Sequence, residues 1–256
     1  MRLITIPMSH YCEKARWGLD RLGLPYTEER HLQGFHYLPA LWAGGGRRVP
    51  VLIDGRKVIS DSTAILRHLD DYAPPGARLY PEDAALLDRV EALEDRFDEV
   101  LGVESRRWVY FHYLTKPDEA LEIASQGAPA GERVLFQAMF PLFGAMLRRG
   151  LEVTRERVQE GIARSRAIVA ETDAPLAEGH GALLGERFSA ADLTLACMLA
   201  PLVLPSRYGI RLPTLEEAPE SMRATVREFR ATRSGEYVLR LFETERTRHL
   251  NASTPP

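Results

Sequence analysis

The first eighty residues alternate short apolar runs with helix-like patterns. Residues 3–6 are rich in β-branched side chains and are closed by Pro7, which is typical of a short strand. Apolar residues then recur at helical spacing over residues 12–22, so a helix is expected there. A second strand is expected over residues 26–30. Together these elements predict a parallel strand–helix–strand unit with a right-handed crossover.

A hairpin is the clearest local prediction. Apolar residues at 51–53 and the segment Arg56-Lys57-Val58-Ile59 flank the pair Asp54-Gly55, and an Asp-Gly pair suits a tight turn with positive φ. Residues 60–62 carry hydroxyl and carboxylate side chains, and apolar residues at helical spacing follow up to Leu69. A capped helix is therefore expected after the hairpin.

The pattern changes after Pro81, where helical periodicity takes over. Residues 72–81 are rich in Pro and Gly and are expected to form a linker. An apolar stripe from Leu86 to Leu101 predicts a long helix that continues into the aromatic cluster at residues 108–113. A break is expected over residues 116–131. Further helices are expected over residues 134–147, 158–169, 193–205, 218–233 and 236–246, and residues 251–256 are expected to be a frayed tail.

The composition of the chain disfavours several classes of protein. The chain has 256 residues, of which 45% are hydrophobic and 27% charged, with a net charge of -3. These are values of a soluble globular protein, so intrinsic disorder, membrane insertion and nucleic-acid binding are disfavoured. The N-terminus lacks a secretory pattern. Only two cysteines are present, Cys12 and Cys197. This number excludes a disulfide scaffold and a cysteine-based zinc site, and it favours a cytoplasmic location. Cys197 is expected in the core.

Four segments resemble motifs of known proteins. Residues 9–16 (Ser-His-Tyr-Cys-Glu-Lys-Ala-Arg) lie at the first strand-to-helix turn and resemble a glutaredoxin Cys-Pro-Tyr-Cys motif with Ser9 in the place of the first cysteine. Residues 49–52 (Val-Pro-Val-Leu) and 61–65 (Asp-Ser-Thr-Ala-Ile) resemble the two glutathione-binding signatures of cytosolic glutathione transferases. Residues 188–192 resemble the capping-box segment in the helical domain of that family. The resemblance implies an α/β thioredoxin-like N-terminal domain (residues 1–75) followed by an all-α helical C-terminal domain (residues 82–250).

The resemblance implies a role for Ser9 in activating glutathione. A thiol is a poor nucleophile near neutral pH, since the thiolate is the reactive species. The Ser9 hydroxyl and the positive end of the first helix would both stabilise a sulfur anion. The alternative is that Ser9 serves only as a helix N-cap.

Other residues are implied to hold the peptide. Pro50 would be a cis-proline that exposes the Val49 backbone to the cysteinyl unit of glutathione. Asp61 would accept from the γ-glutamyl ammonium group, and Ser62 with the helix N-terminus would hold its carboxylate. Two further residues are implied at this site: Arg48 at the glycine carboxylate, unless its loop is only solvated, and Tyr11.

A second-substrate pocket is expected between the domains, at the end of the long helix. Trp108, His112 and Tyr113 are its candidate lining residues. The alternative is that these aromatic side chains simply pack in the core.

The resulting hypothesis is a cytoplasmic glutathione transferase that conjugates the glutathione thiolate to a small electrophile in detoxification. It would need no metal and would act as a homodimer, with no nucleic-acid or membrane partner. One alternative is a glutathione-dependent thiol reductase or dehalogenase in which Cys12 forms a mixed disulfide. Another is a non-catalytic binding or scaffold protein with the same fold.

Overall fold

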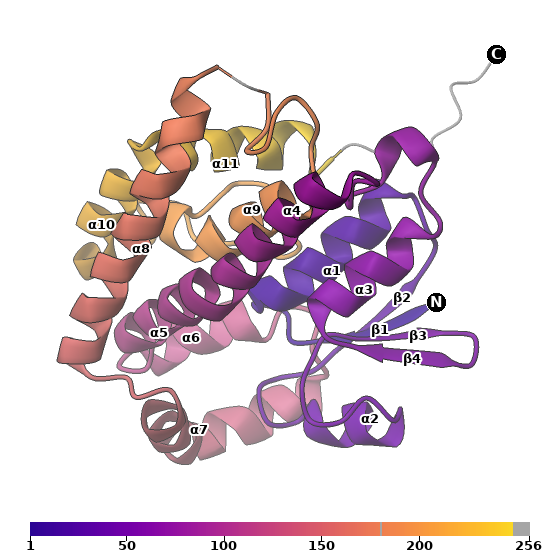
Figure 1. The fold of residues 1–256 in the computed structure, drawn as a ribbon. Helices are drawn as coiled ribbons and strands as arrows, with labels where there is room; N and C mark the ends of the chain where they lie inside the picture. Colours follow the sequence, from indigo (N-terminus) through magenta and orange to yellow (C-terminus); the bar gives the residue numbers. More distant parts are fainter. Residues whose placement is uncertain (180, 248–256) are drawn as a thin grey trace.

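The N-terminal part of the chain is a four-stranded sheet flanked by helices (Figure 1). The computed structural model describes residues 1–179 and 181–247. The sheet has the order β2-β1-β3-β4, with β1 (Arg2–Thr5), β2 (Thr27–Arg30), β3 (Val51–Asp54) and β4 (Lys57–Ser60). β1 and β2 are parallel, whereas β1 with β3 and β3 with β4 are antiparallel. The predicted parallel pair and the predicted hairpin are both confirmed.

Alternation along the strands places helices on both faces of the sheet. Leu3 of β1 and Leu52 of β3 share a buried cluster with side chains of α1 (His10–Arg21) and α3 (Ser62–Asp70). The next residue of β1, Ile4, packs in a separate cluster with Ala40 of α2 (Tyr37–Trp42). Figure 1 accordingly shows α1 and α3 together on one side of the strands and α2 on the other.

The remainder of the described chain is mostly helical. α4 runs into a π-helical turn, η2, and then into α5 without leaving helical backbone angles, so the predicted long helix is confirmed. The helices are α4 (Ala84–Arg96), η2 (Phe97–Leu101), α5 (Gly102–Tyr113), α6 (Pro117–Ala124), α7 (Ala130–Gly150), α8 (Arg155–Ala177), α9 (Ala190–Val203), α10 (Glu220–Arg230) and α11 (Arg233–Thr244).

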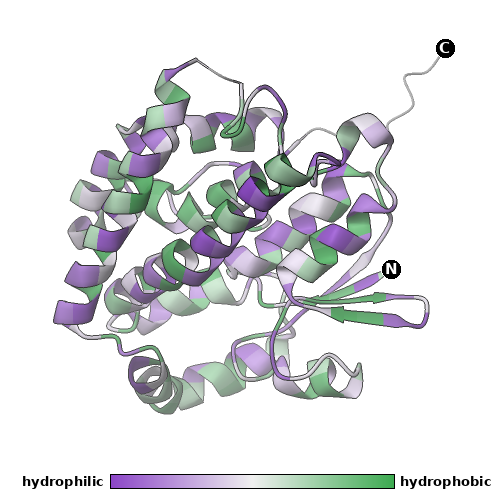
Figure 2. Ribbon diagram, in the orientation of Figure 1, coloured by the Kyte–Doolittle hydropathy of each residue, from purple (hydrophilic) through white to green (hydrophobic). Residues whose placement is uncertain are grey.

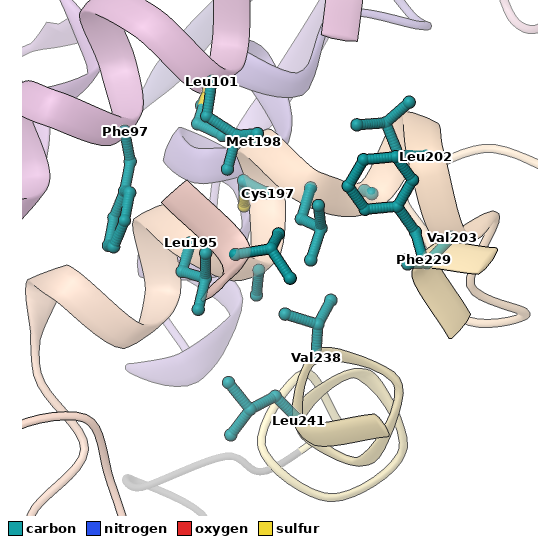
Figure 3. Close-up of a cluster of buried hydrophobic side chains, with 14 of the residues drawn as sticks. Phe97, Leu101, Leu195, Cys197, Met198, Leu202, Val203, Phe229, Val238 and Leu241 are labelled. Atoms are coloured by element: carbon teal, nitrogen blue, oxygen red, sulfur yellow. The ribbon is translucent and has the colours of Figure 1, made fainter. Parts of the chain in front are cut away.

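Helix α9 forms the centre of this region. Every residue of α9 except Pro201 is buried, as expected for a helix that is apolar all round. Ser189 and Asp192 form the capping box predicted for its first turn. Figure 3 shows side chains of α9, among them Leu195 and Met198, within one buried cluster that also contains Phe97 and Val238. Surface helices such as α8 show both purple and green bands in Figure 2, which agrees with one face turned to this core.

The sheet and its flanking helices, here called the sheet region (β1 to α3), pack against the helices that follow, α4 to α11. Trp17 of α1 lies against Phe242 of α11, with ring centroids 4.9 Å apart. Lys14 of α1 is fully buried, and its Nζ lies 2.8 Å from Glu94 Oε1 of α4. Contacts of this kind hold the sheet region in a fixed position relative to the helices α4 to α11.

Some expectations differ from the observed elements. The break expected over residues 116–131 is wrong in part, because α6 starts there with Pro117 in its first turn, a position that proline tolerates. The linker contains one short 3-10 turn, η1 (Pro75–Ala77). The predicted tail at 251–256 lies outside the described residues, and the division into domains at residues 75 and 82 stays a prediction. Within residues 1–179 and 181–247 no helix has the length and hydrophobicity to cross a membrane.

Candidate functional site

A cavity of about 1080 Å³ lies between the sheet region and the helices, slightly above the range of about 300–1,000 Å³ common for small-molecule sites. Turns of the sheet region form one wall, and η2, α5, α6 and α7 contribute to the other. The predicted site residues that line it are Ser9, Tyr11, Arg48, Val49, Pro50, Asp61, Ser62 and Tyr113. The predicted residues outside its lining are Cys12, Trp108 and His112.

Ser9 is the N-cap of α1. Its Oγ accepts a 3.3 Å hydrogen bond from the Cys12 backbone N–H, and the side chain is half-buried at the cavity wall. A hydroxyl that accepts one hydrogen bond can still donate its own proton to a further group. The capping role and the ability to donate to an anion are therefore compatible at Ser9.

The loop before β3 presents backbone groups to the cavity. The Val49–Pro50 peptide bond is cis. Because β3 begins at Val51, the Val49 backbone lies outside the strand pairing with β1 while it lines the cavity. Arg48 beside it is exposed, so its guanidinium can reach an anionic group at the cavity mouth.

Asp61 and Ser62 begin α3 at the cavity. Asp61 has φ 86, and its carboxylate accepts from the backbone N–H groups of Thr63 at 2.9 Å and Ala64 at 3.1 Å. A non-glycine residue at such an angle costs of order 1–3 kcal/mol, and strain of this kind clusters at functional sites. Ser62 is 2% exposed and is the first residue of the helix. Since Asp61 already caps the Thr63 and Ala64 N–H groups, the groups of this turn that remain for an anion are those of Ser62, together with the helix dipole.

The Cys12 side chain is enclosed by protein and lies outside the lining of the cavity. It is fully buried, and its Sγ accepts a 3.4 Å hydrogen bond from the Ile6 backbone N–H. Burial raises the pKa of the Cys12 thiol, although Arg16 opposes the shift. A buried thiol with a raised pKa has little thiolate and little access to a ligand.

The Tyr11 hydroxyl is hydrogen-bonded to the π turn η2. It donates a 2.7 Å hydrogen bond to the backbone carbonyl of Asp98 in η2, and burial raises the pKa of Tyr11 to about 12. π turns within α-helices occur frequently at functional sites. Since the Tyr11 proton is already used, Ser9 is the better placed hydroxyl for a sulfur anion at this turn.

One face of α5 lines the cavity. The residues of α5 that line the cavity share one helical face, with most of them three or four positions apart: Val103, Arg106, Val109, Tyr110 and Tyr113. Tyr113 thus lies at the predicted pocket.

Trp108 and His112 lie elsewhere on the same helix. Trp108 is 2% exposed within the main core cluster. His112 Nδ1 lies 2.8 Å from Ser221 Oγ, and burial lowers the pKa of His112 to about 4. These two side chains are spaced by four residues and therefore share a face other than the one that lines the cavity.

His10 and Arg106 are polar residues of the cavity wall that sequence reasoning did not select. His10 follows Ser9 directly, and Arg106 precedes the aromatic cluster of α5. The signal for Arg106 was its spacing of seven residues from Tyr113, which places both on one helical face. Within the described part of the chain, no group of three or more His, Cys, Asp or Glu side chains could hold a metal ion.

Comparisons with known proteins bear on both the N-terminal region and the whole fold. Residues 3–77 match the family described as the glutathione S-transferase N-terminal domain. A search of curated proteins gave no match.

Several solved structures share the fold over nearly the whole chain. A glutathione S-transferase from Rhodospirillum rubrum is 20% identical, with a TM-score of 0.56 over 100% of this chain and 96% of the other. One from Ceriporiopsis subvermispora, solved in complex with glutathione, is 18% identical, with a TM-score of 0.61 over 95% and 96%. The theta-class enzyme of Xanthomonas axonopodis pv. citri with glutathione bound is 22% identical, with a TM-score of 0.54 over 93% and 96%. The predicted fold, a thioredoxin-like domain followed by a helical region, is confirmed.

Proposed function

Since residues 3–77 match the glutathione S-transferase N-terminal domain family, we propose that this chain binds glutathione and transfers its thiolate to a small electrophile. The observation that carries the proposal is the meeting of two helix N-termini at one cavity. Ser9 caps α1, Ser62 begins α3, and both line the same space. Each terminus favours negative charge, which suits a ligand with a sulfur anion and a carboxylate.

The proposed ligand placement follows from the chemistry of the wall. The cysteinyl backbone pairs with the Val49 peptide group, as an added strand would. The γ-glutamyl carboxylate lies at Ser62 and its ammonium group at the exposed edge of Asp61. The glycine carboxylate reaches Arg48. This orientation leaves the sulfur at Ser9, next to the remaining volume of the cavity.

Ser9 activates the sulfur in this proposal. The hydroxyl donates to the thiolate, and the N–H groups of the first turn of α1 add a favourable dipole. A hydrogen bond to a charged group contributes about 1.5–3 kcal/mol, which corresponds to a bound thiol pKa lowered by about one to two units. The free thiol has a pKa of about 8.5, so a substantial thiolate fraction results near neutral pH.

The burial of Cys12 counts against the reductase alternative. A mixed disulfide requires its sulfur to meet the glutathione sulfur, but Cys12 Sγ is fully buried and outside the cavity lining. The catalytic step assigned here therefore uses the serine and not the cysteine.

The test combines calorimetry with two activity assays. Glutathione is titrated into the wild type, Ser9→Ala and Cys12→Ala, and each is assayed for chlorodinitrobenzene conjugation and for reduction of a mixed disulfide. We expect binding by all three proteins and a fall in conjugation of about 10- to 100-fold only in Ser9→Ala, the equivalent of one charge-assisted hydrogen bond.

Three outcomes would contradict the proposal. Absence of heat at millimolar glutathione would show that the chain does not bind glutathione. Reduction that is lost only in Cys12→Ala would point to the reductase. Binding without turnover in either assay would favour a non-catalytic protein.

A further inference from the structure

Arg106 is a cation in the cavity without a counter-ion. It lies on the face of α5 that lines the cavity. No carboxylate of the described residues forms an ion pair with it, and its Nε is buried without a hydrogen-bond partner. The centroid of the Tyr11 ring lies 5.8 Å from its guanidinium carbon. Arg106 is half-buried, and an anionic ligand in the cavity would supply the missing counter-charge and a partner for the buried Nε.

His10 provides a second polar group at the same place. It is 4% exposed, and its Nε2 has no partner among the residues described. Burial, followed by the nearby charge of Arg106, lowers the pKa of His10 to about 3. The imidazole is therefore neutral near pH 7 and adds no second cation. The Gly102 backbone accepts a hydrogen bond from the ring, so the unpartnered Nε2 is left as an acceptor.

The acidic side chains nearby are engaged elsewhere or lie outside ion-pair distance of Arg106. Asp98 Oδ2 lies 2.7 Å from the Lys14 Nζ, and Asp61 caps α3. Glu99 lines the cavity but is exposed. Arg106 thus has no ion-pair partner among the described residues and lines the same cavity as Ser9, while Arg48 and Ser62 are placed at the other anionic groups of the proposed peptide.

We propose that Arg106 binds a carboxylate carried by the electrophile, so that the chain selects anionic second substrates. The inference rests on the proposed function, because it concerns the molecule that the glutathione thiolate attacks. Arginine is suited to this task because its planar fork binds a carboxylate through two hydrogen bonds.

For an aryl chloride the reaction balances without another reactant. The thiolate sulfur forms a bond to the chlorine-bearing carbon, the C–Cl bond breaks, and chloride leaves with its electron pair. The thiol proton has already passed to solvent. The carboxylate stays ionised throughout and only orients the ring.

The test uses two matched ligands that need no turnover. Glutathione conjugates of chlorodinitrobenzoate and chlorodinitrobenzamide differ only in a carboxylate against a carboxamide. Their affinities are measured by calorimetry for the wild type, Arg106→Met and Arg133→Met. Arg133 is an exposed arginine of α7 outside the cavity lining, so it controls for the loss of one positive charge.

We expect the wild type and Arg133→Met to prefer the carboxylate conjugate by about 10- to 100-fold, the range for a hydrogen bond to a charged group. Arg106→Met should lose most of this preference. In the parallel kinetic assay, the acid-to-amide ratio of kcat/KM should fall in the same variant. If Arg106→Met does not fold, the preference of the wild type and its decrease with added salt still test the idea.

Other outcomes would overturn the inference. Equal affinity of the wild type for the two conjugates would show that no carboxylate site exists, while leaving glutathione binding intact. A weaker affinity of Arg106→Met for glutathione alone would assign the arginine to the peptide. Failure of both conjugates and of glutathione to bind would refute the proposed function itself.

Discussion

Lys14 Nζ lies 2.7 Å from Asp98 Oδ2, so an ion pair joins the first helix of the sheet region to the π turn at the cavity wall. The Lys14 side chain is 0% exposed, and the same ammonium contacts Glu94, which is also buried. Removal of one partner from a buried pair leaves an uncompensated charge. The contact therefore stabilises both the fold and the shape of the site.

Lys14→Met should lower the free energy of unfolding by about 3–5 kcal/mol, the typical cost of a broken buried pair. Urea denaturation measures this value. The control is Lys57→Met on the exposed part of β4, which should change stability by no more than about 0.5 kcal/mol. Equal effects of the two substitutions would mean that the buried pair is not a stabilising contact.

Gly102 allows α5 to approach α1 closely. A Cβ at this position would collide with Met198 Sδ and would lie 2.7 Å from the Tyr11 hydroxyl oxygen. Gly102→Ala should therefore cost about 1–3 kcal/mol, as overpacking does, and should weaken glutathione binding by displacing Tyr11.

Gly131→Ala is the matched control for this prediction. Gly131 lies in α7 and has open space where a Cβ would be placed. Alanine there should be neutral or stabilising by up to about 1 kcal/mol. Thermal unfolding with a glutathione titration distinguishes the two variants, and a stable Gly102→Ala with unchanged affinity would refute the packing argument.

His31 makes the docking of α7 dependent on pH. Its Nδ1 lies 2.6 Å from Glu132 Oε1 near the start of α7, and its Nε2 lies 3.0 Å from Glu29 Oε1. Burial lowers the pKa of His31, but the hydrogen bonds to Glu132 and Glu29 outweigh it, and the pKa is raised above its ordinary value.

The sign of the effect follows from that shift. A raised pKa in the folded state means that the stabilisation is complete below the unfolded pKa of about 6.5 and is lost as pH rises through the folded value. Wild-type unfolding free energy should thus exceed that of His31→Gln at low pH, and the difference should shrink at alkaline pH. Urea denaturation at several pH values measures it; a difference that is constant or grows with pH would contradict the assignment.

The two cysteines should be protected in the native protein. Cys12 and Cys197 are each 0% exposed, and burial raises the pKa of both thiols. Neither should react with an aromatic disulfide reagent over a period in which both react fully in urea. Fast modification of Cys12 that glutathione prevents would instead support a redox role.

The sequence predicted the sheet region well because its signals are local. The Asp54-Gly55 turn and the β-branched strand at residues 3–6 each specify their element within a few positions. Helix α2 was not predicted because it has six residues, only Ala40 of which is buried, so no apolar stripe marks it. Helix α6 is hidden by the Pro and Gly residues around it, although Leu121 and Ala124 are buried.

The sequence predicted one wall of the site better than the other, again because only local signals can be recognised. Ser9 and Ser62 belong to short segments with a recognisable order, so their shared cavity could be expected. The second wall depends on which face of α5 meets the sheet region, and that is decided by long-range packing of Gly102 against Tyr11. Hence Tyr113 was selected together with Trp108, whereas Arg106 on the cavity face was overlooked.

The most direct test of the central claim is the pKa of the glutathione thiol when bound. It is obtained from the ultraviolet absorbance of the thiolate as a function of pH, with the wild type and Ser9→Ala at saturating glutathione. We predict a bound pKa below the free value of about 8.5 in the wild type and a return towards that value in Ser9→Ala. An identical pKa in both proteins, or no bound thiolate at all, would contradict the assignment of Ser9 as the residue that stabilises the sulfur anion.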